Sequence, residues 1–298
     1  MSERPTPWHL NLTLTLGVLA VSTAAPLVRL AMHAAAEQSV GFSLVLAALR
    51  LSIAAMILLP AWGSVTQPKP TSVGISYAIA AGVALAVHFA TWITSLAFTS
   101  IAASTALVTT NPVWVALLSW VWLGEIPTHK MLAGIGIALL GGVLIGLGGI
   151  QPTATGSNPL LGDGLALAGA WAASLYFLLG REAQRNGLSI GSYVVVAYSM
   201  AAIALLPLPL VLGTSYTSYS PTVYGYITLM AFIPQLLGHT SFNWAVRWIS
   251  PTIVSLVILF EPVLSSGLGF LLFKEIPPAP VLLGALVLLI GVAIAIKG

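Results

Sequence analysis

The chain of 298 residues contains no cysteine and very few charged side chains. The absence of cysteine excludes disulfide bonds, thiolate metal sites and a cysteine nucleophile. Only 6% of the residues are charged and 58% are hydrophobic. Because a soluble domain carries about 25% charged residues, this composition does not fit a single water-soluble core, and we expect an integral membrane protein.

The sequence also lacks the motifs of a membrane enzyme. Its only aspartate is Asp163, so the paired aspartates of an intramembrane protease are missing, and no His-Glu-x-x-His motif is present. No ATP-binding motif occurs, and the few excess basic residues do not indicate nucleic-acid binding. We therefore expect no enzyme, no cofactor and no metal ion. An intramembrane enzyme and a structural membrane protein remain the alternatives to a transporter driven by a gradient.

Apolar runs separated by polar turn residues predict an all-α polytopic membrane protein with ten transmembrane helices. Each run is close to the roughly 20 residues that cross a bilayer, and is about twice as long as the alternating segments of a membrane β-barrel. The first run lacks the strongly basic start of a signal peptide, so we interpret it as a retained helix. The predicted helices are 11–33, 40–62, 73–97, 101–123, 129–149, 161–183, 190–212, 222–247, 252–273 and 279–296.

Two halves of the chain repeat one pattern at an offset of 150 residues. The matched pairs are Pro112/Pro262, Val113/Val263, Glu125/Glu275, Ile126/Ile276, Pro127/Pro277, Gly134/Gly284 and Gly141/Gly291. We assign residues 1–150 and 151–298 to two five-helix repeats, joined by the polar segment 151–159. Since each repeat has an odd number of helices, the second must be inverted, as in many secondary transporters.

The basic residues are distributed unevenly between the two predicted sides of the membrane. The side that holds the N-terminus carries Arg4, Lys69, Lys130, Arg181, Arg185, Arg247 and Lys297, whereas the other side carries Arg29 and Lys274. Cytoplasmic loops are enriched in Lys and Arg. We therefore expect both termini to be cytoplasmic.

Two charges, Arg50 and Glu261, lie near the middle of predicted helices, at the depth of the bilayer midplane. A charge at that depth costs about 2.5–3.5 kcal/mol, so it faces a partner or a cavity. One interpretation is a structural ion pair between the two. The other is functional: Arg50 meets an anionic group of the solute, or Glu261 takes up and releases a proton.

The matched prolines Pro112 and Pro262 also lie in mid-helix, where each follows a polar residue, Asn111 or Glu261. A proline removes one backbone donor and displaces the carbonyl four residues before it. At membrane depth, only protein or cavity water can satisfy that carbonyl. We expect two kinked helices that line a shared interior, although kinks for packing alone remain possible.

Several polar and aromatic residues are further candidates for a substrate cavity. His88 shares a helix face with Trp92, and His239 shares one with Asn243, because four residues separate the members of each pair. An imidazole beside aromatic rings suits an aromatic or cationic solute. Interhelical hydrogen bonding and interfacial aromatic belts are the alternatives. Further aromatic candidates on neighbouring helices are Trp114, Trp171 and Tyr176.

The segment between the fourth and fifth helix of each repeat, and the fifth helix itself, contain residues with structural interpretations. Glu125 and Glu275 each precede a proline that opens the next helix, which indicates helix capping. The glycines of 129–149 and 279–296 allow close helix packing, so these helices are packing supports or the face of a homodimer.

With these motifs, the chain resembles the EamA branch of the drug/metabolite transporter superfamily. The resemblance rests on Pro112, Leu123-Gly124-Glu125 and Gly134, and on Pro262 and Gly284, while Phe273-Lys274 departs from the Leu-Gly pattern. Arg50 also looks like an arginine common in the second helix of this branch. The resemblance implies alternating access in the plasma (inner) membrane, usually for the export of amino acids, other metabolites or drugs. Protons are one candidate for the coupling ion.

Overall fold

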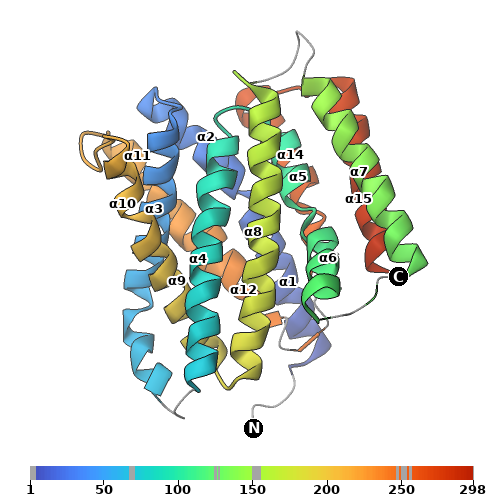
Figure 1. Cartoon of the computed structure of the whole chain (residues 1–298). Coiled ribbons are helices and arrows are strands. Elements are labelled where there is room, and N and C mark those ends of the chain that lie inside the picture. The colour runs from blue at the N-terminus through green and yellow to red at the C-terminus, as the bar shows by residue number, and fades with distance from the viewer. Residues whose placement is uncertain are drawn as a thin grey trace.

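The computed structural model describes residues 5–66, 71–123, 126, 128–149, 156–245, 248–249, 254 and 257–297. These residues are mostly helical and contain no β-strand. The helices lie side by side in one bundle, and both chain ends lie toward the same end of it (Figure 1). The all-α fold expected from the sequence is therefore confirmed for the described residues.

Every described helix overlaps one of the predicted ranges, but several ranges are divided into shorter helices. The first half forms α1 (Pro7–Ser22), α2 (Ala24–Ala35), α3 (Val40–Ile57), η1 (Leu59–Thr66), α4 (Ser72–Ser95), α5 (Ile101–Val108), α6 (Asn111–Leu123) and α7 (His129–Gly149). The second half forms α8 (Pro159–Arg185), α9 (Ile190–Leu205), α10 (Pro207–Val211), α11 (Pro221–Met230), η2 (Ala231–His239), α12 (Thr240–Ala245), α14 (Glu261–Phe273) and α15 (Ala279–Ile296).

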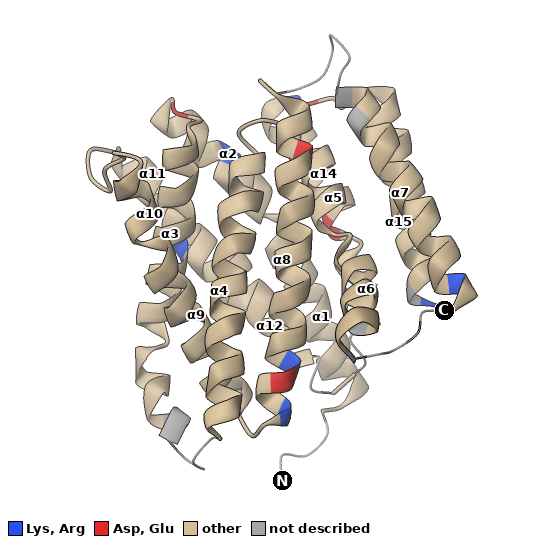
Figure 2. Cartoon of the chain, viewed as in Figure 1, with Lys and Arg blue, Asp and Glu red and all other residues tan. Residues whose placement is uncertain are grey.

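Six helical segments within the described residues are long and apolar enough to cross a membrane, and three shorter apolar helices accompany them. The ten-helix count itself stays a prediction. Lys and Arg lie near the two chain ends, and also at the opposite end and in the middle of the bundle (Figure 2). Four charged residues used in the sequence argument, Arg4, Lys69, Arg247 and Glu125, lie outside the described residues, as does most of the predicted linker.

Short polar residues fix where several helices begin. Ser39, Thr71, Ser100 and Ser189 each accept a hydrogen bond from the backbone N–H three residues later, at the first turn of α3, α4, α5 and α9. Such caps satisfy donors that the helix itself leaves unpaired. These polar residues therefore determine the helix boundaries that the sequence pattern placed only approximately.

The glycine-bearing helices α7 and α15 pack against each other (Figure 1). A Cβ atom on Gly134 would meet Ala295, whereas one on Gly148 would meet Val281, 2.6 Å from its side chain. The start of α7 therefore lies beside the end of α15, so the two helices are antiparallel. This antiparallel pairing is what an inverted repeat requires of the two fifth helices, and their glycines are used inside the molecule.

The predicted kinks at the two matched prolines stay predictions, and a short non-helical turn, at residues 109–110 and 259–260, precedes each of these prolines. Pro112 and Pro262 lie in the first turn of α6 and α14, which begin at Asn111 and Glu261. At that position the missing N–H of proline has no helical partner to lose. Each matched proline therefore marks a helix that begins in the interior of the bundle.

Candidate functional site

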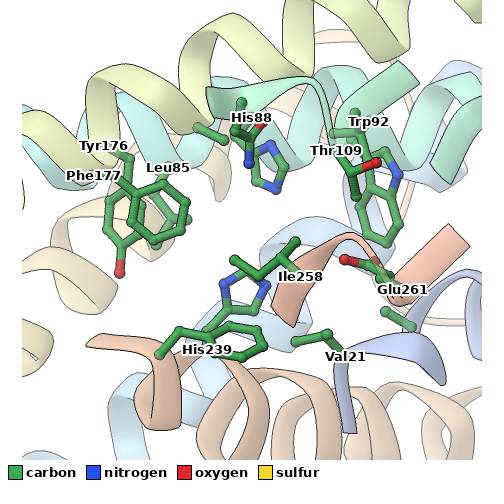
Figure 3. Close-up of a pocket in the computed structure, with 15 residues that line it drawn as sticks. Val21, Leu85, His88, Trp92, Thr109, Tyr176, Phe177, His239, Ile258 and Glu261 are labelled. Atoms are coloured by element: carbon green, nitrogen blue, oxygen red, sulfur yellow. The ribbon is translucent and has the colours of Figure 1, made fainter. Parts of the chain in front are cut away.

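A pocket lies where these interior helix starts meet α4 and α8. Its volume is about 40 Å³. Side chains from both halves of the chain surround it (Figure 3). The lining residues are Val21, Ala24, Leu85, His88, Trp92, Val108, Thr109, Asn111, Ala173, Tyr176, Phe177, His239, Phe242, Ile258 and Glu261.

The pocket brings together six of the residues singled out from the sequence. They are His88, Trp92, Asn111, Tyr176, His239 and Glu261. They come from α4, α6, α8, η2 and α14, which are far apart in the sequence. The pocket is therefore assembled only when the two halves of the chain pack together.

His88 on α4 is held by a hydrogen bond between its Nδ1 and the backbone carbonyl of Gly169 on α8, at 2.9 Å. Its ring is parallel to that of Trp92, with 6.0 Å between the ring centroids. The ring of His239 approaches it edge-on at 6.4 Å. The close approach of α4 and α8 depends on Gly169, where a Cβ atom would lie 3.2 Å from the Cβ of Trp92.

Asn111 compensates for the helix break at which it lies. With its amide nitrogen turned toward the carbonyls, it donates hydrogen bonds to Ala170 at 3.2 Å and to Val108. Val108 lies four residues before Pro112. Its carbonyl receives no helical hydrogen bond from residue 112, because proline has no backbone N–H. The backbone carbonyl of Asn111 in turn accepts from the hydroxyl of Ser174 at 3.0 Å. Backbone groups exposed by the break are therefore satisfied inside the protein.

Arg50 does not pair with Glu261 in this structure. It is completely buried, its Nε donates to Oε1 of Gln235 at 3.1 Å, and its Cζ lies 4.2 Å from the centroid of the Phe89 ring. Both terminal nitrogens of its guanidinium lack a hydrogen-bond partner in the described part of the chain. The carboxylate of Glu261 points into the pocket (Figure 3). The structural ion pair is thus not formed here.

Three other predicted residues lie outside the pocket. Asn243 is behind its wall, where its amide donates to the hydroxyl of Tyr176 at 2.7 Å. The indole nitrogen of Trp114 donates to Thr110 at 3.0 Å, beside the helix break. The placement of Trp171 in the cavity is wrong, because its side chain is 45% exposed on the surface of the bundle. Two residues along a helix correspond to about 200°, so Trp171 faces away from the pocket residue Ala173.

Sequence reasoning missed Gln235, which binds Arg50 from the π-helical segment η2. It follows Pro234 inside an apolar segment, and this proline next to a polar residue is the same signal that singled out Asn111 and Glu261. Short π-helical turns often occur at functional sites. The pattern Pro-Gln was therefore the available sequence signal.

Glu275 caps a different helix from the one expected. Its Oε1 accepts a hydrogen bond from the backbone N–H of Ile101 at 2.6 Å, at the start of α5, and its Oε2 lies 3.6 Å from Nη1 of Arg29. Burial raises the pKa of the Glu275 carboxyl, while Arg29 and the Ile101 N–H act in the opposite direction. The residue joins the end of the second repeat to the first.

Comparison with known proteins identifies the family. The model of the EamA-like transporter family matches residues 11–147 and again residues 160–297. The chain belongs to the EamA-like transporter family. It is an integral membrane protein of a family that carries small solutes across the bilayer, and its two matches correspond to the two halves recognised from the repeat.

Individual relatives of this EamA-like transporter are distant. An uncharacterized transporter, YyaM, of Bacillus subtilis (strain 168) is 26% identical over 225 residues, which cover 74% of this chain and 72% of the relative. A probable terminal-alkyne amino-acid exporter of Streptantibioticus cattleyicolor is 26% identical over 189 residues, or 62% of this chain and 61% of the relative.

A solved crystal structure of a protein shares the fold. It superposes with a TM-score of 0.61 at 19% identity, and the match covers 97% of this chain and 96% of the other. At that level of identity, the likeness concerns the fold alone.

Proposed function

We propose that this EamA-like transporter is a secondary active exporter that moves amino acids or related small metabolites by alternating access. The observation that carries the proposal is the pocket, because both halves of the chain contribute to it and two helices begin beside it. Interrupted helices from two repeats commonly form the substrate site of secondary transporters. The name of the Streptantibioticus relative supports amino acids as the solute class.

The pocket is small, so the helices around it must move before a solute can bind. Its volume of about 40 Å³ is little more than the roughly 30 Å³ that one water molecule occupies in the liquid. An amino acid is larger, so the helices around the pocket separate when solute enters. Interior helix starts such as that of α6 allow this, because α5 and α6 are not joined by continuous helical hydrogen bonds.

Two charged groups suit the coupling of solute to an ion gradient. Glu261 faces the pocket, where its carboxylate is suited to take up and release a proton. Arg50 has two unpartnered nitrogens behind the pocket and is suited to an anionic group of the solute once the helices separate. We place both termini in the cytoplasm and the protein in the plasma (inner) membrane.

Counterflow in proteoliposomes tests this proposal. Vesicles that contain the purified protein are loaded with each of the twenty amino acids in turn, and the uptake of the same labelled amino acid is measured. We expect exchange of at least one of them, and Glu261→Gln should abolish its proton-driven accumulation. Glu182→Gln is the matched control, since Glu182 pairs with Arg185 at an exposed helix end. Absence of exchange for all twenty would contradict the proposal.

A further inference from the structure

The tautomer of His88 is determined by its hydrogen bond to Gly169. A carbonyl oxygen only accepts, so Nδ1 of His88 is the protonated nitrogen. In a neutral imidazole, Nε2 then carries a lone pair and is an acceptor. Figure 3 shows the other ring nitrogen of His88 directed into the pocket, and no described residue donates to it.

The carboxylate of Glu261 is a second acceptor in the same pocket (Figure 3). Two potential donors in the wall are used elsewhere. The hydroxyl of Thr109 donates to the backbone carbonyls of Thr105 and Ala106, and the amide of Asn111 donates to Ala170. The hydroxyl of Tyr176, which accepts from Asn243, points away from His88 and Glu261 (Figure 3). The indole N–H of Trp92 has no hydrogen-bond partner among the described residues either. The pocket therefore presents two unpaired acceptors, His88 Nε2 and the Glu261 carboxylate, beside this unpaired donor.

The surroundings of these two acceptors favour a small cation. The ring of Trp92 lies parallel to that of His88, and its π-face attracts positive charge. The pocket volume of about 40 Å³ exceeds the roughly 30 Å³ of one water molecule in the liquid, so one ammonium group fits in it. No cluster of three or more metal-ligating side chains occurs among the described residues, so a metal ion lacks ligands here.

We infer that Nε2 of His88 and the carboxylate of Glu261 form a subsite for the protonated amino group of the solute. This inference rests on the proposed export function and narrows it to solutes that carry a free amine. His88 is then a specificity-determining residue, because an ammonium group donates to both acceptors whereas a hydroxyl or an acylated amine carries no charge to match Glu261. Gly169 is a positioning residue that keeps the His88 acceptor directed at the pocket.

Two isosteric probes test the subsite without the need for a known solute. Phenethylamine and 2-phenylethanol differ only in their head group, and each is titrated into the purified protein while the apparent melting temperature is followed. We expect the amine to raise the melting temperature and the alcohol to leave it unchanged. Equal responses to the two probes, including no response to either, would overturn the inference.

Two substitutions of His88 separate recognition from structure. An asparagine amide can replace Nδ1 and keep the bond to Gly169, but it does not reach the position of Nε2, so His88→Asn should fold normally and bind the amine about tenfold more weakly. A glutamine amide reaches the Nε2 position, so His88→Gln should retain part of the amine response. An unchanged amine response in His88→Asn would overturn the inference.

The experiments distinguish a failure of the export proposal from a failure of the ammonium subsite. Counterflow of amino acids that is equally fast for an N-acetylated derivative would leave export standing and remove the ammonium subsite. A selective amine response without counterflow of any amino acid would leave the subsite standing and remove the proposed solute class.

Discussion

The carboxylate of Glu275 accepts a hydrogen bond at 2.6 Å from the backbone N–H of Ile101, a residue 174 positions earlier in the chain. The same carboxylate lies 3.6 Å from the guanidinium of Arg29 on α2. Arg29 also donates to the backbone carbonyl of Thr99 at 2.8 Å. This buried cluster ties the loop between α14 and α15 to two segments of the first repeat.

Replacement of Glu275 should therefore reduce stability. Glu275→Ala leaves the buried Arg29 without a carboxylate and the Ile101 N–H without an acceptor, which we expect to cost about 3–5 kcal/mol. Glu275→Gln keeps one oxygen as the acceptor for the Ile101 N–H but offers Arg29 no carboxylate, so it should lose less stability than the alanine variant. The apparent melting temperature in detergent is the measurement. Glu182→Ala is the control, because Glu182 pairs with Arg181 and Arg185 near the end of α8, where each solvent-accessible ion pair is worth at most about 1 kcal/mol. Equal losses in the two alanine variants would refute the role of the cluster.

The same residue predicts a pH dependence of stability. Burial raises the pKa of Glu275 above its ordinary value of 4.5, so the native state binds the proton more tightly than the unfolded chain. The stability from this group is fully present below pH 4.5 and is lost as the pH rises through its folded-state pKa. Melting temperatures measured from pH 4 upward should fall more in the native chain than in Glu275→Gln. Parallel curves for the two proteins would exclude this contribution.

The pairing of α7 and α15 can be tested with two alanine substitutions on one helix. A Cβ atom on Gly141 would overlap the backbone of Leu288, so Gly141→Ala should cost about 1–3 kcal/mol. Gly136 has open space around the same position, and Gly136→Ala should be neutral or stabilise the helix by up to about 1 kcal/mol. Thermal unfolding of both variants decides the matter. Tolerance of alanine at Gly141 would mean that the two helices are not so close.

Gln235 accepts a hydrogen bond from Arg50, so substitutions of Gln235 should change how well the guanidinium of Arg50 binds an anionic group of the solute. Gln235→Glu places a carboxylate beside the buried guanidinium, so it should stabilise the protein and slow counterflow of solutes that carry a carboxylate, because Arg50 is then neutralised within the protein. Gln235→Leu removes a hydrogen bond to a charged group and should cost about 1.5–3 kcal/mol. Melting temperature and counterflow are measured on both variants. Faster counterflow in Gln235→Glu would argue against an anion-binding role for Arg50.

We predict a cytoplasmic C-terminus from the basic residues Lys130, Arg181, Arg185 and Lys297. A C-terminal reporter enzyme that is active only outside the cytoplasm should give no signal, whereas a fluorescent reporter that matures in the cytoplasm should be bright. The opposite pair of results would invert the assigned orientation.

The sequence by itself determined the class of protein, its approximate helical regions and the presence of two related halves. Composition excludes a water-soluble core, and the length of the apolar runs selects helices over strands. The repeat around Pro112 and Pro262 singled out the two places next to which α6 and α14 begin, although the sequence predicted kinks there and not separate helices. These features are local or periodic, so they can be read without knowledge of which segments touch.

Only the tertiary structure decided which polar groups meet. The sequence placed Arg50 and Glu261 at similar depths, but depth does not fix rotation about the bundle, and Arg50 bonds to Gln235 instead. Capping by Glu275 was expected within its own helix and occurs across 174 residues. The acceptor role of His88 likewise depends on a carbonyl of α8. Each of these hydrogen bonds joins segments that are distant in the sequence. Buried polar groups find such partners only when the helices pack in the folded chain.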